Sequence, residues 1–214
     1  MWARAGLVAL MAAFTIASGS PAEAKTVKLV AFGDSLTTGY GLPKADSFAA
    51  KLEVALRARG LDVSVANAGV SGDTASMGLA RLDWSIPADT DGVIVELGAN
   101  DMLRGQPPAT TRKALTDILS RLKSRGVPVL LAGMRAAPNM GADYQKAFDG
   151  IYPDLAREFG TLYYPFFLEG VAGTRGLNLP DGIHPTAAGI DIIVANILPK
   201  VEELVQRASR RAGQ

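Results

Sequence analysis

The chain contains no cysteine and only one histidine, His184, among its 214 residues. The lack of cysteine excludes disulfides, thiolate nucleophiles, iron–sulfur clusters and cysteine lipidation. A zinc site built from histidine and cysteine is nearly excluded, and a carboxylate site for Mg²⁺ or Ca²⁺ has no positive support. We therefore expect no metal and no cofactor, and any reaction that needs an imidazole must use His184.

The chain also lacks an excess of charge of either sign. Lys and Arg total 22 and Asp and Glu total 21, which gives a formal net charge of +1. Nothing is left over to neutralise a row of phosphates, so a nucleic-acid partner is not expected. The hydrophobic content of 48% and the chain length predict one globular domain with a substantial core.

No apolar run is long enough to span a membrane, but a shorter one lies at the amino terminus. Arg4 precedes an apolar stretch at residues 5–17, and residues 22–24 form an A-x-A cleavage pattern before Lys25. A membrane span needs about 20 apolar residues, so the stretch is too short for an anchor. The pattern predicts a signal peptide at residues 1–24 and a mature domain at residues 25–214. The absence of cysteine then indicates a bacterial periplasmic or secreted protein, with no stable membrane span once the signal is removed.

Short apolar runs alternate with amphipathic stretches along the mature chain. Strands that alternate with helices of this length indicate βαβ units, a parallel sheet and right-handed crossovers. The fold class predicted is α/β, a three-layer α/β/α sandwich with five parallel strands in the flavodoxin-like order 2-1-3-4-5. The expected strands are residues 27–32, 63–66, 92–98, 127–132 and 161–164, and the expected helices are residues 47–59, 74–83, 110–125, 141–159 and 186–208.

The residues that follow the predicted strands carry the candidate chemistry. In an open parallel sheet, ligands bind beyond the carboxyl ends of the strands. A hydroxyl nucleophile, a glycine turn, a side-chain amide and an Asp/His pair occur there, and together they are the groups needed for acyl transfer. The four segments are residues 33–36, 67–73, 98–101 and 181–185.

These four segments resemble the blocks of the SGNH hydrolase family, also called GDSL esterases and lipases. The family's four letters fall on Ser35, Gly72, Asn100 and His184, in chain order. Residues 100–105 are most similar to the bacterial group of multifunctional acyl-CoA thioesterase I, lysophospholipase L1 and arylesterase. The resemblance implies a serine hydrolase of carboxylic esters or thioesters, with an acyl-enzyme on Ser35 and a small acyl ester as substrate.

The residues themselves favour the same roles. Ser35 lies at the end of the first strand, and a serine hydroxyl needs an adjacent base, which His184 alone can supply. Asp181, three residues before His184, can reach Nδ1 of the ring in a tight turn and fix its tautomer. The alternatives are a helix-capping Asp181, a structural imidazole and a strand-end serine that only caps.

A hydrolase of this kind also needs donors aimed at the oxyanion. The backbone N–H groups of Ser35 and Gly72 and the side-chain amide of Asn100 fit this role, and glycine permits the positive φ of such a turn. Gly72 could instead be an ordinary turn glycine and Asn100 a loop-capping amide. The neighbouring aspartates Asp34, Asp73 and Asp101 are interpreted as structural.

Two segments are expected to line an acyl pocket, the loop at residues 101–108 and residues 134–141. Their methionines suit varied apolar groups, although ordinary loop packing would look the same in sequence. Two other functions stay open, a carbohydrate O-deacetylase of the same superfamily and a non-catalytic binding module with this fold. The expected lining residues are Met102, Leu103, Met134, Pro138 and Met140.

Overall fold

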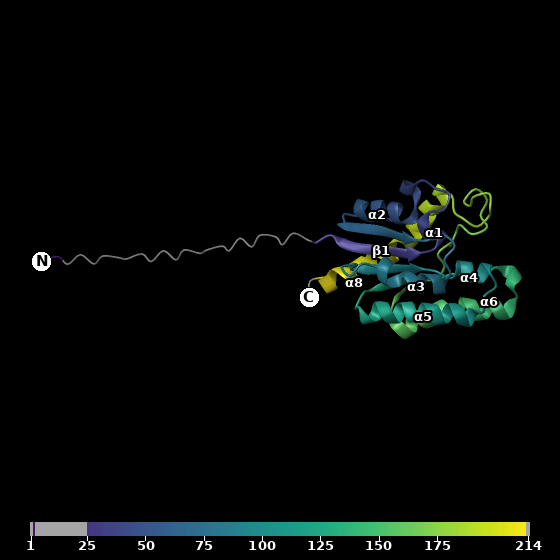
Figure 1. The fold of residues 1–214 in the computed structure, drawn as a ribbon. Helices are drawn as coiled ribbons and strands as arrows, with labels where there is room; N and C mark the ends of the chain where they lie inside the picture. Colours follow the sequence, from purple (N-terminus) through teal and green to yellow (C-terminus); the bar gives the residue numbers. More distant parts are fainter. Residues whose placement is uncertain (1, 3–24, 213–214) are drawn as a thin grey trace.

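The computed structural model describes Trp2 and residues 25–212, so apart from Trp2 the predicted signal peptide at residues 1–24 lies outside the described residues. The described chain contains one sheet of five parallel strands in the order β2-β1-β3-β4-β5 (Figure 1). This arrangement confirms the predicted fold class and strand order. The strands are β1 (Val27–Gly33), β2 (Val63–Gly69), β3 (Gly92–Glu96), β4 (Val129–Ala132) and β5 (Leu162–Tyr164).

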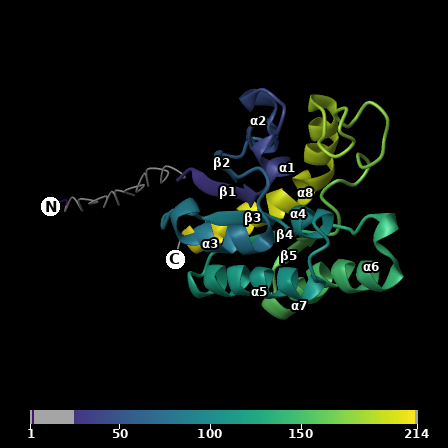
Figure 2. The same ribbon diagram turned by 45° about the vertical axis from the view of Figure 1, so that its right-hand side comes forward.

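Helices cover both faces of the sheet. Helices α2 (Phe48–Ala58) and α8 (Ala187–Ala212) pack together on one face. On the other face lie α3 (Ala75–Ser85), α5 (Pro108–Ser124) and α7 (Ile151–Phe159) (Figure 2). The shorter elements are α1 (Ser35–Thr38), α4 (Ala99–Leu103), α6 (Ala142–Asp149) and the 3₁₀ turns at Lys44–Asp46 and Pro138–Met140.

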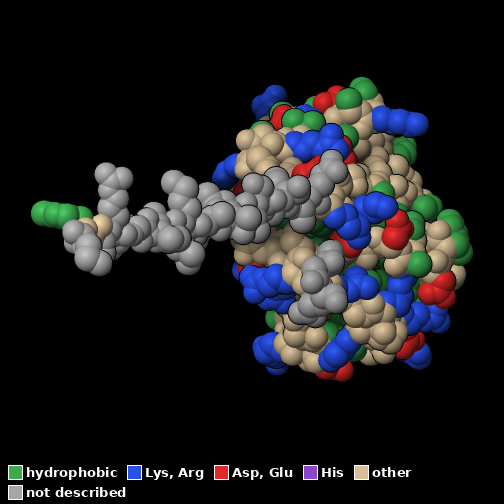
Figure 3. Space-filling model, turned by 90° about the vertical axis from the view of Figure 1, so that its left-hand side faces the viewer, with side chains coloured by type: hydrophobic (Ala, Val, Ile, Leu, Met, Phe, Trp, Pro, Cys, Tyr) green, Lys and Arg blue, Asp and Glu red, His purple; other side chains and the backbone are tan. Residues whose placement is uncertain are grey.

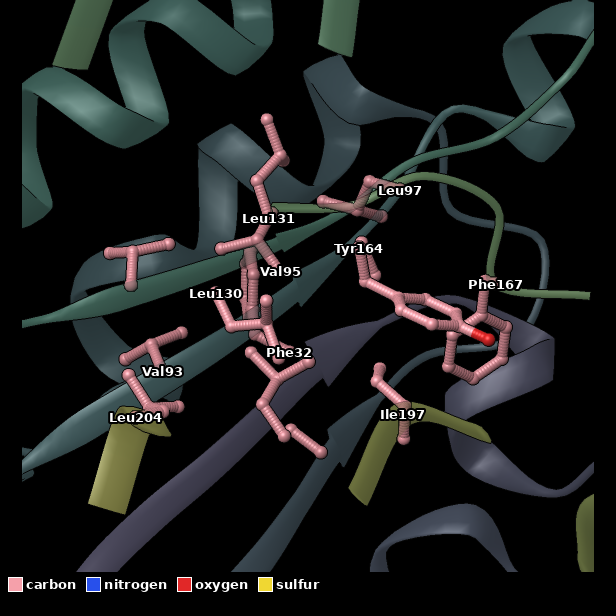
Figure 4. Packing of buried hydrophobic residues seen from close by; sticks show 14 of the residues in the cluster. Phe32, Val93, Val95, Leu97, Leu130, Leu131, Tyr164, Phe167, Ile197 and Leu204 are labelled. Atoms are coloured by element: carbon pink, nitrogen blue, oxygen red, sulfur yellow. The ribbon is translucent and has the colours of Figure 1, made fainter. Parts of the chain in front are cut away.

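The core lies between these layers and is built from the central strands. Every residue of β3 and β4 is buried, as expected for strands that helices cover on both sides. Figure 4 shows side chains of these strands packed with Ile197 and Leu204 of α8. Phe167 adds an edge-to-face contact with Phe48 at 5.0 Å between ring centroids. The sheet is therefore a rigid base for whatever its strand ends carry.

One expected helix, residues 141–159, is wrong. The structure has two helices there, α6 and α7, with Gly150 between them. Pro153 explains the break, because it has no N–H to donate to the carbonyl of Asp149. Its ring also favours the first turn of a new helix, which is where it lies. Two short helices, α1 and α4, also occur where loops were expected, and both carry candidate site residues.

The strands define two ends of the molecule. Strand β1 begins and α8 ends on the left of Figure 1, whereas α4 and α6 lie on the right, beyond the carboxyl ends of the strands. The left-hand end is seen in Figure 3, where basic and acidic side chains are interspersed. Among residues 25–212, no helix has the length and apolar composition needed to cross a membrane.

Candidate active site

Ser35 is the first residue of α1, directly after the turn that ends β1. Asp34 caps this helix, since its Oδ1 accepts the backbone N–H of Leu36 at 2.9 Å. The serine side chain faces the loop before α8, where its Oγ lies 2.9 Å from His184 Nε2. The cap and the strand together fix where this hydroxyl stands.

His184 is oriented by the turn that precedes it. Asp181 Oδ1 accepts the backbone N–H groups of Ile183 and His184, at 2.9 and 3.0 Å, and Gly182 takes a φ of 72°. Asp181 Oδ2 lies 2.7 Å from Nδ1 of the ring. Hydrogen bonds from the backbone and ring of His184 lower the pKa of Asp181 to about 2. Asp181 is therefore an anion that both forms the turn and contacts the ring.

The ring of Tyr40 lies against the imidazole of His184. Its ring centroid is 4.4 Å from that of His184, and 52% of its surface is exposed. The sequence analysis did not find this residue, because no spacing rule pairs two rings so far apart in the chain. Only the fold reveals the contact.

Gly72 lies in the loop after β2 with a φ of 87°, as expected for a turn that needs glycine. Its carbonyl accepts a hydrogen bond from Arg104 at 2.7 Å. The backbone N–H groups of Gly72 and Ser35 donate to no other residue within 25–212. Both backbone donors are thus without an acceptor in the described part of the chain.

Asn100 lies in the first turn of α4, and its amide joins the other two segments. Its Nδ2 donates to Asp34 Oδ2 at 3.0 Å and to the carbonyl of Asp73 at 3.1 Å. The structure therefore brings Asn100 together with the end of β1 and the loop that holds Gly72. Both hydrogens of the amide have protein acceptors.

A cavity of about 680 Å³ opens beside Ser35, Asn100 and His184. Met102, Leu103, Met134 and Pro138 line it as expected, but Met140 does not. The sequence analysis missed a third wall, which follows β5 and includes Phe166 and Leu168. The lining is mostly apolar, with Arg135 and His184 as its ionisable side chains.

Residues 31–192 match the GDSL-like Lipase/Acylhydrolase family. The chain belongs to this family. The match spans β1 to α8 and includes every residue of the cluster around Ser35.

Known members of the GDSL-like family resemble the chain over most of its length. It is 37% identical to Esterase TesA of Pseudomonas aeruginosa over 86% of this chain and 92% of that one. It is 40% identical to an arylesterase of Vibrio mimicus, over 84% and 88% of the two chains. The crystal structure of AlinE4, an SGNH-hydrolase family esterase, superposes with a TM-score of 0.72 at 47% identity and covers 85% of this chain and 98% of that one. The resemblance to the esterase and thioesterase group is confirmed.

A buried arginine holds the segments of this GDSL-like site in place. Arg81 of α3 donates to Asp73 Oδ2 at 2.5 Å, to the Ala68 carbonyl at 2.9 Å and to the Gly33 carbonyl at 2.8 Å. Its guanidinium also lies 4.3 Å from the centre of the Phe32 ring. One planar cation thus joins the ends of β1 and β2 to the loop of Gly72, which a lysine could not do.

The neighbouring aspartates have the structural roles expected of them. Asp73 pairs with Arg81, and the buried Asp101 accepts the backbone N–H of Ala75 at 2.8 Å and the hydroxyl of Thr111 at 3.0 Å. Burial raises the pKa of Asp101. Asp101 thus connects the start of α3 with α5.

A second carboxyl group, which the sequence analysis missed, lies beneath Asp34. Glu96, the last residue of β3, is fully buried, and its Oε2 accepts the hydroxyl of Thr37 at 2.8 Å. The only signal in the sequence is one acidic residue within an apolar strand. Such a residue is rarely buried without a partner.

We expect Arg81→Met to lower the free energy of unfolding by about 3–5 kcal/mol, because it leaves the buried Asp73 carboxylate without its partner. Arg121→Met is the matched control, since Arg121 of α5 pairs with Asp83 on the surface. That exposed pair should be worth about 0–1 kcal/mol. Urea unfolding of both variants measures the difference. Equal losses would show that Arg81 does not support the site.

Proposed function

We propose that the protein hydrolyses carboxylic esters or thioesters of acyl chains through an acyl-enzyme on Ser35. The observation that carries this proposal is the chain of contacts from Ser35 Oγ to His184 Nε2 and from His184 Nδ1 to Asp181, at 2.9 and 2.7 Å, at the mouth of an apolar cavity. Membership of the GDSL-like family supports it independently.

In the proposed mechanism each proton passes through His184. His184 Nε2 takes the hydroxyl proton of Ser35 as Oγ attacks the carbonyl carbon, and then gives it to the departing alcohol or thiol. Water gives a proton to the same nitrogen and attacks the acyl-enzyme, the bond between the acyl carbon and Oγ breaks, and the proton returns to Ser35 Oγ as the acid is released. Asp181 holds the Nδ1–H tautomer and stabilises the imidazolium, for which its low pKa keeps it ionised.

The charge on the carbonyl oxygen is stabilised by three donors. These are the backbone N–H groups of Ser35 and Gly72 and the side-chain amide of Asn100. The two backbone groups have no competing acceptor within residues 25–212, which supports this assignment. The amide has two, so it must share or exchange one of them when the oxyanion forms.

The cavity favours an acyl chain over a polysaccharide as the bound group. Its apolar lining and volume of about 680 Å³ suit a medium or long hydrocarbon chain. An O-deacetylase would need little room for acetate and more polar groups for sugar. The complete set of site residues argues against a binding module.

We further propose that residues 1–24 are removed on export to the periplasm or the medium. The order of Arg4, an apolar stretch and an A-x-A pattern supports this proposal.

Ser35→Ala and His184→Ala should each lower kcat for an aryl ester by about 10⁴-fold or more, without unfolding the protein. The double variant should be hardly slower than either single one, because the two groups act as a unit. A fluorophosphonate probe should label the wild-type protein at Ser35 and leave Ser35→Ala unlabelled. Near-normal hydrolysis by either single variant would refute the assignment.

Asn100→Ala should lower kcat by about 10²–10³-fold, or roughly 2.7–4 kcal/mol, with little change in KM, because the amide binds the charged transition state better than the substrate carbonyl. Asn100→Asp should be slower still, since it places a carboxylate beside the developing anion and Asp34. Steady-state kinetics on one ester compare the two. An active Asn100→Asp variant would mean that the oxyanion is bound elsewhere.

The dependence of activity on the length of the substrate's acyl chain tests the proposed substrate class. The kcat/KM for a decanoyl aryl ester should exceed that for the acetyl ester, because each buried CH₂ contributes about 0.8 kcal/mol. Ala172→Phe, in the cavity wall, should reduce kcat/KM for the decanoyl ester more than for the acetyl ester. A preference for acetyl would instead favour the deacetylase.

Mass spectrometry of protein exported by a bacterial host should find Lys25 at the amino terminus. Recovery of chains that begin with Met1 in the membrane fraction would contradict the proposed processing.

A further inference from the structure

Two carboxyl groups lie side by side beneath the nucleophile, where β1 and β3 end. Asp34 and Glu96 each have 0% of their surface exposed. They lie in closely packed surroundings, since a Cβ added at Gly33 would lie 2.6 Å from Glu96 Oε2. Neither group is needed for the proton path from Ser35 to His184, so their burial calls for another explanation.

The two groups have different partners. Asp34 accepts the Leu36 N–H through Oδ1 and the Asn100 amide through Oδ2, at 2.9 and 3.0 Å. Glu96 Oε2 accepts the Thr37 hydroxyl at 2.8 Å and the backbone N–H of Asp34 at 3.4 Å, so the two acids are in contact, whereas Oε1 is buried and receives no donor from the described part of the chain. A neutral carboxylic acid carries its proton on one of its two oxygens. In Glu96, Oε1 is the oxygen that receives no hydrogen bond from the described residues and so can carry the proton.

Two buried carboxyl groups in contact cannot both be ionised. Burial, followed by the nearby Asp34 charge, raises the pKa of Glu96 well above its usual value. Burial raises the pKa of Asp34 only to about 6, because the Leu36 N–H, the Asn100 amide and the nearby His184 oppose it. The proton therefore belongs to Glu96 and the negative charge to Asp34.

We propose that Glu96 is a positioning residue for the oxyanion donor Asn100: as a neutral acid it donates a hydrogen bond to Asp34, and the Asp34 anion in turn fixes the side-chain amide of Asn100. This inference rests on the proposed function, in which Asn100 binds the oxyanion. Glu96 itself touches neither the substrate nor the reacting atoms.

The two acceptors of the Asn100 amide, Asp34 Oδ2 and the carbonyl of Asp73, explain how Asp34 positions this amide. A hydrogen bond to the Asp34 anion is stronger than one to the neutral carbonyl of Asp73. A developing oxyanion therefore takes over the hydrogen that points to Asp73, while the other stays on Asp34 and keeps the amide plane in place. If Asp34 became protonated, the Asn100 amide would lose its hydrogen bond to an anion, and its orientation would no longer be fixed.

Other charged groups face this pair from the surrounding elements. His184 in the loop before α8 acts on Asp34, and Arg81 of α3 binds the carbonyl of Gly33. Tyr152 of α7 donates to the carbonyl of Leu97, the residue after Glu96, at 3.0 Å, and burial and the nearby Asp101 of α4 keep the pKa of Tyr152 well above its usual value, so its hydroxyl stays neutral. Asp101 accepts hydrogen bonds from Ala75 and Thr111, so of these two acids it is Glu96 that contacts Asp34.

The test compares Glu96→Gln with Glu96→Leu. Gln can donate to Asp34 and accept from Thr37, so we expect its kcat to stay within about threefold of wild type. Leu fills the space without donating, so we expect kcat to fall about 10–100-fold while KM changes less than about twofold. Val95→Ala, one position earlier on the opposite face of β3, is the control for lost packing, and its kcat should be unchanged.

The pH dependence separates positioning from a merely structural role. Without the donor at position 96, Asp34 takes up a proton at higher pH, so the ratio of wild-type to Glu96→Leu kcat should grow as the pH falls from about 8 to 6. The same ratio for Glu96→Gln should stay flat. Full activity of Glu96→Leu, a Glu96→Gln variant as slow as Glu96→Leu, or a ratio independent of pH would each overturn the inference.

Two measurements do not depend on the folding of Glu96→Leu. The infrared band of a protonated carboxyl group should be present in the wild-type protein at pH 7 and absent from Glu96→Gln, and its absence from the wild type would overturn the inference. Fluorophosphonate labelling of Ser35 tests the proposed function separately. A wild-type protein that is neither labelled nor active refutes that function, whereas active wild type with an equally active Glu96→Leu refutes only the role of Glu96.

Discussion

Parallel strands must all end at the same edge of their sheet, and the site depends on this constraint. Because β1, β2 and β3 are neighbours, the residues that follow them meet although they are far apart in sequence. Arg81 exploits the convergence, since one guanidinium reaches the last carbonyl of β1, the end of β2 and the loop beyond it. Removing the parallel order would separate Ser35, Gly72 and Asn100 even if each strand still formed.

The site concentrates polar groups that a core would otherwise avoid. Asp34, Glu96, Asp101 and Arg81 are all buried, and each has hydrogen-bond partners that offset its desolvation. Such a network is costly when it is incomplete and rigid when it is complete. The rigidity suits the proposed oxyanion site, whose donors must already point at the charge before it develops.

The fold and the main site residues could be predicted from the sequence because both depend on local patterns. Apolar runs predicted the strands, and their alternation with helices favoured the strand order. Ser35 and Asn100 closely follow two of these strands, and the family resemblance added His184 in the loop before the last helix. What could not be predicted depends on packing between distant segments. Tyr40 against His184, Glu96 beneath Asp34 and the cavity wall after β5 have no periodic signal. The break at Gly150 was readable in principle from Pro153, but the amphipathic pattern continues across it.

The turn at residues 181–184 makes His184, the proposed base, and Asp181, its proposed orienting carboxylate, a single local unit. Asp181 contacts both the backbone and the ring of His184, so the two side chains keep their relation wherever the turn goes. Completion of the proposed triad then requires one contact, between Ser35 and His184, which are 149 positions apart. In the proposed mechanism, a loop displacement would inactivate Ser35 without disturbing the Asp181–His184 pair, and return of the loop would restore the contact in one step. The four-residue turn could therefore be transplanted into a different protein scaffold, because that scaffold would have to supply only a serine hydroxyl at hydrogen-bonding distance from the imidazole.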